Sequence, residues 1–255
     1  MYALFVSGSD DGNIPDWQEN VEKYKEEIIE IGNNIIQHCT EDAIRLDAKS
    51  RLGFHYCEIG EPEKGKRIFE SLPSIDSCKE VMMDWALRGE ESCQYNREMF
   101  SHFLRIALWK IWYISTESNC LPVEKIKQLL KIEQIVRIIY NDADLGDWYL
   151  SLSRIYLNGL ALLALDCGNI DEMFSYMRLG VEYMKKYAAL PETYVHTSAL
   201  VKGVCDKRYG HTADSRTPWE IIVERELTDK RYDGIREDER FQTIIDELSN
   251  IAYNE

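Results

Sequence analysis

The sequence lacks the features that mark a membrane or exported protein. No apolar run approaches the length of about 20 residues that a bilayer-spanning helix requires. The first residues, Met1–Gly8, carry none of the basic residues that open a signal peptide. We therefore expect a cytoplasmic protein that makes no contact with a membrane.

Positive charge is also scarce. The 255 residues include 30 lysines and arginines against 45 aspartates and glutamates, which gives a formal net charge of −15. A protein that binds DNA or RNA needs a basic face to neutralise phosphates, and an anionic membrane selects for basic residues in the same way. The composition therefore disfavours direct binding to nucleic acid.

The chain has no recognisable catalytic or metal-binding motif. Its seven cysteines are spread along the sequence without a Cys-x-x-Cys pair, which predicts reduced thiols and no zinc module. The nucleophile elbow, the metalloprotease helix motif and the Walker loop are all missing. We predict no catalytic residue, no metal, no cofactor and no enzymatic activity.

A helix–turn–helix pattern occurs twice, in Leu52–Phe69 and in Leu160–Met177. When Gly60 is aligned on Gly168, a leucine followed by a small residue falls at the same place in both copies. The small residue lets two helices approach closely, as in a tetratricopeptide-type unit with its usual period of about 34 residues. Such units build extended binding surfaces, so the pattern favours a binding protein.

Helical spacing of apolar residues continues through most of the chain, and no strand-type alternation lasts more than a few residues. We predict an all-α fold: a tetratricopeptide-like array of antiparallel helix pairs, or α-solenoid. Residues 1–15 are expected to be a linker and residues 16–255 a single domain, with a capping helix at about 237–251. The secondary structure of residues 191–217 is ambiguous.

Four residues are expected to face the concave groove of this array. Arg51 and Phe54 hold these positions in the first copy, and Asn158 and Leu162 hold them in the second. An asparagine amide can both donate to and accept from a peptide backbone, and an arginine can hold a carboxylate with two hydrogen bonds. The alternative is that Arg51 pairs with nearby acids and Asn158 faces solvent.

Aromatic residues are dense in the middle of the chain. They include Trp109, Trp112, Trp148, Tyr149 and Tyr156. Core filling explains such residues in most proteins, and a ligand pocket is the alternative. The pair Trp148 and Tyr149 lies next to a predicted loop, which makes it the stronger candidate for a pocket.

Several short motifs together resemble the tetratricopeptide-type C-terminal regulatory region of bacterial Xre-class helix-turn-helix transcriptional regulators. They are Leu52-Gly53-x-x-Tyr56-x-Glu58-Ile59-Gly60-Glu61-x-Glu63-Lys64-Gly65, Leu72-Pro73-Ser74-Ile75, Thr197-Ser198, and Tyr232-Asp233-x-Ile235-Arg236-x-Asp238-x-Arg240-Phe241. The last motif is also expected to close the array, with Asp238 as the N-cap of the final helix and Phe241 packed inward.

This resemblance implies a regulatory domain that forms a homodimer and, in some members, binds a small peptide or other effector. Such regulators contact DNA through an N-terminal helix-turn-helix domain, and no basic recognition helix is visible in this chain. We therefore expect a protein or peptide partner, with DNA contacted only through a domain absent from this sequence. The alternative is a stand-alone adaptor that binds a partner protein.

Overall fold

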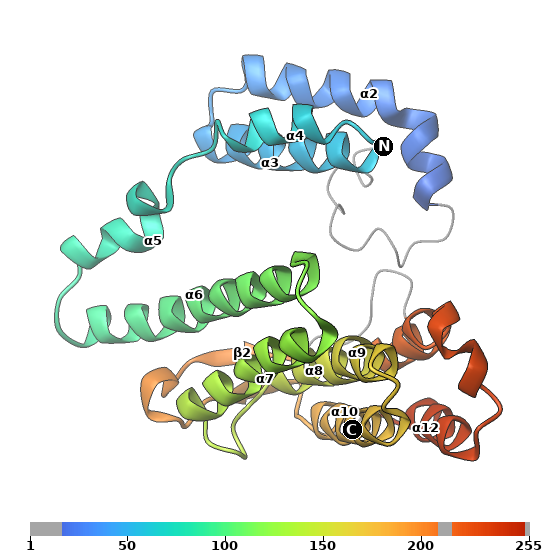
Figure 1. Ribbon diagram of the computed structural model, residues 1–255. Helices are drawn as coiled ribbons and strands as arrows, with labels where there is room; N and C mark the ends of the chain where they lie inside the picture. Colours follow the sequence, from blue (N-terminus) through green and yellow to red (C-terminus); the bar gives the residue numbers. More distant parts are fainter. Residues whose placement is uncertain (1–16, 209–215, 253–255) are drawn as a thin grey trace. The chain divides into compact units, whose positions relative to one another are not determined.

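The computed structural model describes residues 17–208 and 216–252, and these are overwhelmingly helical (Figure 1). The all-α prediction is confirmed. Contacts divide the described chain into two compact units, residues 17–85 and residues 86–208 with 216–252. Among the described residues, no helix is both long and apolar enough to cross a lipid bilayer. The predicted linker at residues 1–15 lies outside the described residues.

The first unit is built around a three-helix core. Its elements are α2 (Trp17–His38), α3 (Asp42–Glu58), α4 (Pro62–Phe69), the 3-10 turn η2 (Ile75–Ser77), α5 (Lys79–Met82) and the 3-10 turn η3 (Met83–Trp85). Helices α2, α3 and α4 lie side by side (Figure 1). Their shared core is small and centres on Ile28, Ala48 and Leu52.

The first repeat copy forms the predicted hairpin between α3 and α4. Gly60 has a positive φ of 80°, and the Glu61 N–H donates to the Tyr56 carbonyl at 2.8 Å, as in a Schellman helix end. A Cβ on Gly53 would lie 2.5 Å from the ring of Phe69. The small residue is therefore required for the close approach that the sequence predicts.

The second unit contains the larger core. Its helical elements are α6 (Gly89–Glu117), α7 (Pro122–Ile139), α8 (Trp148–Arg154), the π-helical segment η4 (Ile155–Leu160), α9 (Ala161–Asp166), α10 (Ile170–Ala188), the 3-10 turn η5 (Ala199–Val201), α11 (Pro218–Ile221), the π-helical segment η6 (Ile222–Glu226), the 3-10 helix η7 (Lys230–Ile235) and α12 (Glu239–Ser249). Segments α8, η4 and α9 follow one another without a break.

The second repeat copy has the same helix end as the first. Gly168 has a φ of 74°, and the Asn169 N–H donates to the Ala164 carbonyl at 2.9 Å. These residues align one for one with those that close the first hairpin. The two copies therefore share their turn geometry, in agreement with the sequence alignment.

The ambiguous segment contains a short β-hairpin. Strands β1 (Thr193–Val195) and β2 (Cys205–Lys207) pair antiparallel, with Tyr194 opposite Asp206. Strands of three residues are too short to show an alternating pattern in the sequence. Residues 209–215 of this segment lie outside the described residues.

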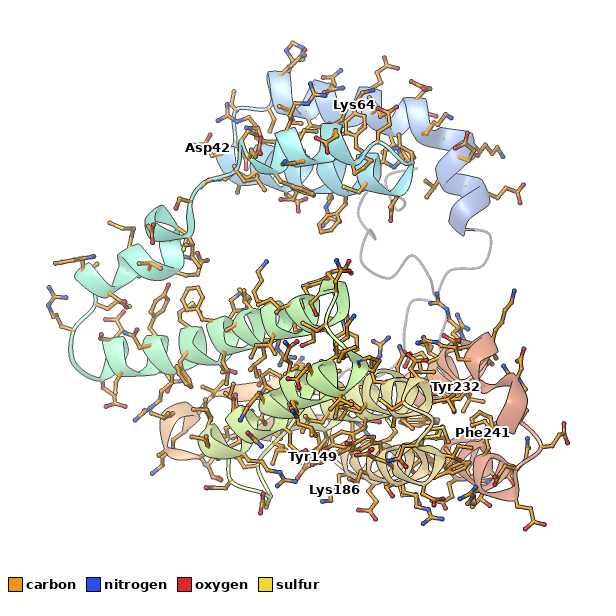
Figure 2. All side chains as sticks on the ribbon, in the orientation of Figure 1. Asp42, Lys64, Tyr149, Lys186, Tyr232 and Phe241 are labelled. Atoms are coloured by element: carbon orange, nitrogen blue, oxygen red, sulfur yellow. The ribbon has the colours of Figure 1, made fainter. Side chains whose placement is uncertain are left out.

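The C-terminal motif leads into α12, the last helix of the described residues. The Asp238 side chain accepts from the Arg240 N–H at 2.9 Å and caps α12, which confirms the prediction. Phe241 is fully buried, and its ring lies 5.3 Å from that of Tyr232 (Figure 2). The Tyr232 hydroxyl donates to the carbonyl of Leu157 in η4 at 2.9 Å. The motif thus anchors the π-helical segment.

Candidate ligand-binding cleft

Two of the four predicted groove residues lie on α3 in the first unit. The Arg51 Nε donates to the Asp47 carboxylate at 2.8 Å, one turn earlier on the same helix. Phe54 is 56% exposed, and its ring lies edge-on to Phe69 at 5.4 Å. For Arg51, the structure agrees with the alternative that it pairs with a neighbouring acid.

The other two predicted groove residues lie in the second unit, and only one of them is accessible. Leu162 is 2% exposed and belongs to the hydrophobic core, so its assignment to a groove is wrong. Its counterpart in the first copy, Phe54, is exposed on α3, whereas Leu162 on α9 is covered by the larger core of the second unit. Asn158 itself is half-buried and borders two hollows.

The first of these hollows, the aromatic cleft, is a cavity of about 280 Å³ between α6, α7 and the α8–η4 helix. Its lining residues are Leu108, Trp109, Trp112, Tyr113, Ile132, Trp148, Ser151, Arg154, Ile155 and Asn158. Trp109 and Tyr113 lie one turn apart on α6 and are 58% and 52% exposed, whereas Trp148 is buried. From the sequence, these aromatic residues could either fill the core or line a ligand pocket. The structure places several of them around a cavity.

The π-helical segment shapes the wall of the aromatic cleft. Gly159 lies in this segment, and a Cβ there would be 3.0 Å from the Trp112 ring and 3.2 Å from Leu129. Glycine therefore lets the indole of Trp112 approach the backbone of η4. Single π turns inside α-helices frequently occur at functional sites, which makes this wall a reasonable place for binding.

The second hollow, the polar hollow, adjoins the aromatic cleft and has a volume of about 630 Å³. Arg154 and Asn158 line both cavities. The Arg154 guanidinium donates to Glu226 Oε1 at 2.6 and 3.0 Å, while Glu226 Oε2 is buried and has no hydrogen-bond partner among the described residues. An apolar cleft with a few polar groups at one end is the usual form of a ligand site.

A tyrosine cluster near the cleft is structural. Glu133 of α7 accepts hydrogen bonds from Tyr156, Tyr183 and Arg137. Burial alone would raise the pKa of Glu133, but the hydrogen bonds from these three residues outweigh it and lower the pKa. Beside them, Lys186 lies 5.9 Å above the ring of Tyr149 (Figure 2). For Tyr149 and Tyr156, core filling is therefore the better explanation.

Sequence reasoning missed a buried histidine between two aspartates. His196 follows β1, and its Nδ1 and Nε2 lie 3.1 Å from Asp144 Oδ1 and 3.2 Å from Asp206 Oδ2. Burial would lower the pKa of His196, but hydrogen bonds and charges from Asp206 and Asp144 raise it above its ordinary value. Asp144 is distant from the other two in the sequence, and the β-hairpin places His196 beside Asp206.

Asp144 also organises the turn after β1. Its Oδ2 accepts from the backbone N–H groups of Thr197 and Ser198 at 2.9 and 2.7 Å. Burial raises the pKa of Asp144, but these bonds and the Ser198 hydroxyl lower it overall. The Thr197-Ser198 pair noted in the sequence therefore docks the hairpin onto the loop before α8.

Comparisons with known proteins give no match, whether with protein-family models, with curated proteins or with solved structures. Within residues 17–208 and 216–252, no three histidine, cysteine or acidic side chains are grouped so that they could hold a metal ion. The candidate function therefore rests on the cavities of the second unit.

Proposed function

We propose that the protein is a non-enzymatic regulatory module that binds a peptide or peptide-like effector in the aromatic cleft and the adjoining polar hollow. One observation carries the proposal. An apolar cavity walled by tryptophans opens beside a polar hollow, and the two share Arg154 and Asn158. Peptides present this same combination of apolar side chains and polar backbone groups.

The two cavities would bind different parts of a peptide. An apolar side chain in the aromatic cleft would gain about 1.5–3 kcal/mol from burial. Among the described residues, the amide of Asn158 makes no hydrogen bond, so it can both donate to and accept from a peptide unit. The Glu226 carboxylate holds the Arg154 guanidinium at the border of the two cavities, where it can contact a bound peptide.

The proposal also includes the biological role that the family resemblance implies. We infer a tetratricopeptide-like, homodimeric regulatory domain of a cytoplasmic transcriptional regulator, in which effector binding alters DNA affinity through an attached helix-turn-helix domain. The shared hairpin ends support the repeat, and the exposed residues Ile106, Trp109 and Tyr113 along α6 provide apolar surface of the kind used in interactions. A stand-alone adaptor is the second candidate, and it needs the same surface but no dimer.

Peptide selection tests the binding function. A random heptapeptide phage library would be selected on the immobilised full chain, and enriched peptides measured by fluorescence anisotropy. We expect Trp109→Ala and Asn158→Ala to weaken binding at least tenfold. Trp85→Ala is the matched control, because Trp85 is 77% exposed and lies in the first unit.

Two results would contradict the proposal. One is the absence of any peptide that enriches above a protein carrying Trp109→Ala. The other is an affinity that falls as much with Trp85→Ala as with Trp109→Ala. Sedimentation equilibrium addresses the dimer separately, and a chain that stays monomeric at high concentration favours the adaptor.

A further inference from the structure

His196 lies where the β-hairpin meets the loop before α8. Its side chain is 3% exposed, and both of its ring nitrogens face oxygen atoms. Nδ1 lies 3.1 Å from both the Oδ1 and the backbone carbonyl oxygen of Asp144, and Nε2 lies 3.2 Å from Asp206 Oδ2. Carboxylates and carbonyls only accept hydrogen bonds, so both nitrogens must carry a proton for both contacts to form. The geometry therefore requires the imidazolium form of His196.

Loss of one proton affects the two contacts differently. A neutral imidazole has one N–H and one lone pair, so it can donate to only one of the two aspartates. Asp144 offers two acceptors to Nδ1, and its Oδ2 is held by the backbone N–H groups of Thr197 and Ser198. Among the described residues, His196 is the only hydrogen-bond partner of the Asp206 carboxylate, whose side chain is 33% exposed. We therefore expect the neutral ring to keep its proton on Nδ1 and to release Asp206.

The contact between His196 and Asp206 helps to hold β2 in place. Through His196, it ties the strand to Asp144 and so to the loop before α8. Without this contact, β2 is held by its backbone pairing with β1. A two-stranded hairpin is marginally stable in water by itself, so its order depends on side-chain contacts with the rest of the fold. Strand β2 also borders a cavity of about 650 Å³, which α6 lines from the other side.

Other titratable and charged groups surround His196 on every side. They are Tyr140 after α7, Asp144 and Asp147 in the loop before α8, Tyr194 on β1, Asp206 on β2 and, beyond Asp206, Arg105 on α6.

Most of these groups keep their charge where His196 loses its proton. The hydrogen bond from His196 lowers the pKa of Asp206, and burial raises the pKa of Tyr194. Burial alone would raise the pKa of Asp144, but hydrogen bonds from Ser198 and Thr197 lower it overall. These three groups therefore do not change charge just above pH 6.5. Burial also raises the pKa of Asp147, so the test has to separate its titration from that of His196.

We propose that His196 is a pH-operated latch of the β-hairpin. While the imidazolium donates to both aspartates, β2 is held against the loop before α8. As the pH rises, the Nε2 proton passes to solvent, Asp206 is released, and β2 can move relative to the cavity that it borders. The latch does not involve the aromatic cleft, so this proposal and the peptide-binding proposal can fail independently.

An NMR titration of the unmodified full chain, labelled with 15N and 13C, tests the latch without any variant. Below the His196 midpoint, both ring nitrogens should have the chemical shifts of an imidazolium. Above it, Nε2 should have the shift of an unprotonated nitrogen while Nδ1 keeps its proton. Amide protection factors of residues 203–208, corrected for the intrinsic exchange rate at each pH, should fall at least threefold with the same midpoint.

Three variants identify the groups responsible. Asp206→Asn replaces the carboxylate by an amide, which can donate to the Nε2 lone pair of the neutral ring, so the step in protection should disappear. Asp147→Asn removes the other carboxyl with a raised pKa and should keep the step. Glu98→Gln removes a charge from an exposed residue that lines the same cavity, and it should also keep the step.

Four results would overturn the latch. The first is a neutral His196 whose proton lies on Nε2, and the second is amide protection in β2 that does not follow the His196 midpoint. The third is a step in protection that persists in Asp206→Asn. The fourth is a step that disappears in Asp147→Asn, which would assign the response to that carboxyl.

Discussion

The substitution Gly65→Ala probes a close backbone contact between two helices of the first unit. Gly65 is the fourth residue of α4, and an ideal Cβ there would lie 2.6 Å from the Gly53 carbonyl oxygen and 2.6 Å from the Cys57 Sγ. The sulfur can rotate away, but the carbonyl belongs to the backbone of α3. Helices α3 and α4 would therefore have to separate.

The expected cost follows from two opposing effects. Overpacking at a tight contact costs about 1–3 kcal/mol, and alanine improves helix propensity by about 1 kcal/mol relative to glycine. Because the contact at Gly65 is with a backbone carbonyl, we expect a packing cost in the upper part of this range. We therefore expect the hairpin to lose about 1–2 kcal/mol of stability.

Native-state hydrogen exchange measured by mass spectrometry can detect this loss locally. Peptides covering residues 42–69 should exchange faster in Gly65→Ala, with a smaller free energy of opening. Gly234→Ala is the control, because a Cβ at Gly234 meets no atom within 4 Å and the residue lies in the second unit. Unchanged exchange over α3 and α4 in Gly65→Ala would refute the close approach.

Three further substitutions test the second unit by urea unfolding. Leu162→Ala should lower the free energy of unfolding by about 2–5 kcal/mol because Leu162 is buried in the core. An unchanged free energy of unfolding would indicate instead that Leu162 lies on a surface groove. Tyr232→Phe should cost about 1–3 kcal/mol because the Leu157 carbonyl loses its donor, and a loss below 0.5 kcal/mol, roughly the scale of neutral surface changes, would show that this bond contributes little. His196 has a raised pKa, so its stabilisation is complete below its ordinary value of 6.5 and is lost as pH rises through the raised pKa. His196→Gln should therefore remove the fall in unfolding free energy above pH 6.5, and a fall that persists in the variant would show that it comes from another group.

The sequence allowed the hairpins to be predicted because local signals fix them. A glycine at the helix end has a φ that other residues rarely adopt, and this applies equally to Gly60 and Gly168. The N-cap at Asp238 is similarly local, since its side chain bonds a backbone group two residues later. Such interactions depend on neighbours in the chain and not on the tertiary fold.

The binding cavities could not be predicted in this way. The groove position of Leu162 was inferred from its alignment with Phe54, but Leu162 is covered by the core of the second unit. The contacts of His196 with Asp144 and Asp206 depend on a β-hairpin whose strands have three residues each, too few to reveal a period of two. Both cases depend on tertiary contacts that the local sequence does not signal.

The π-helical segment links the C-terminal motif to the proposed binding function. The Tyr232 hydroxyl satisfies the Leu157 carbonyl of this segment, and two residues later Gly159 admits the ring of Trp112. Asn158 lies between these two contacts and borders both hollows. A motif that resembles the closing segment of a repeat array therefore does more than end the fold. It supports the irregular helix that forms one wall of the aromatic cleft, so a change at Tyr232 is expected to affect the cleft as well as stability.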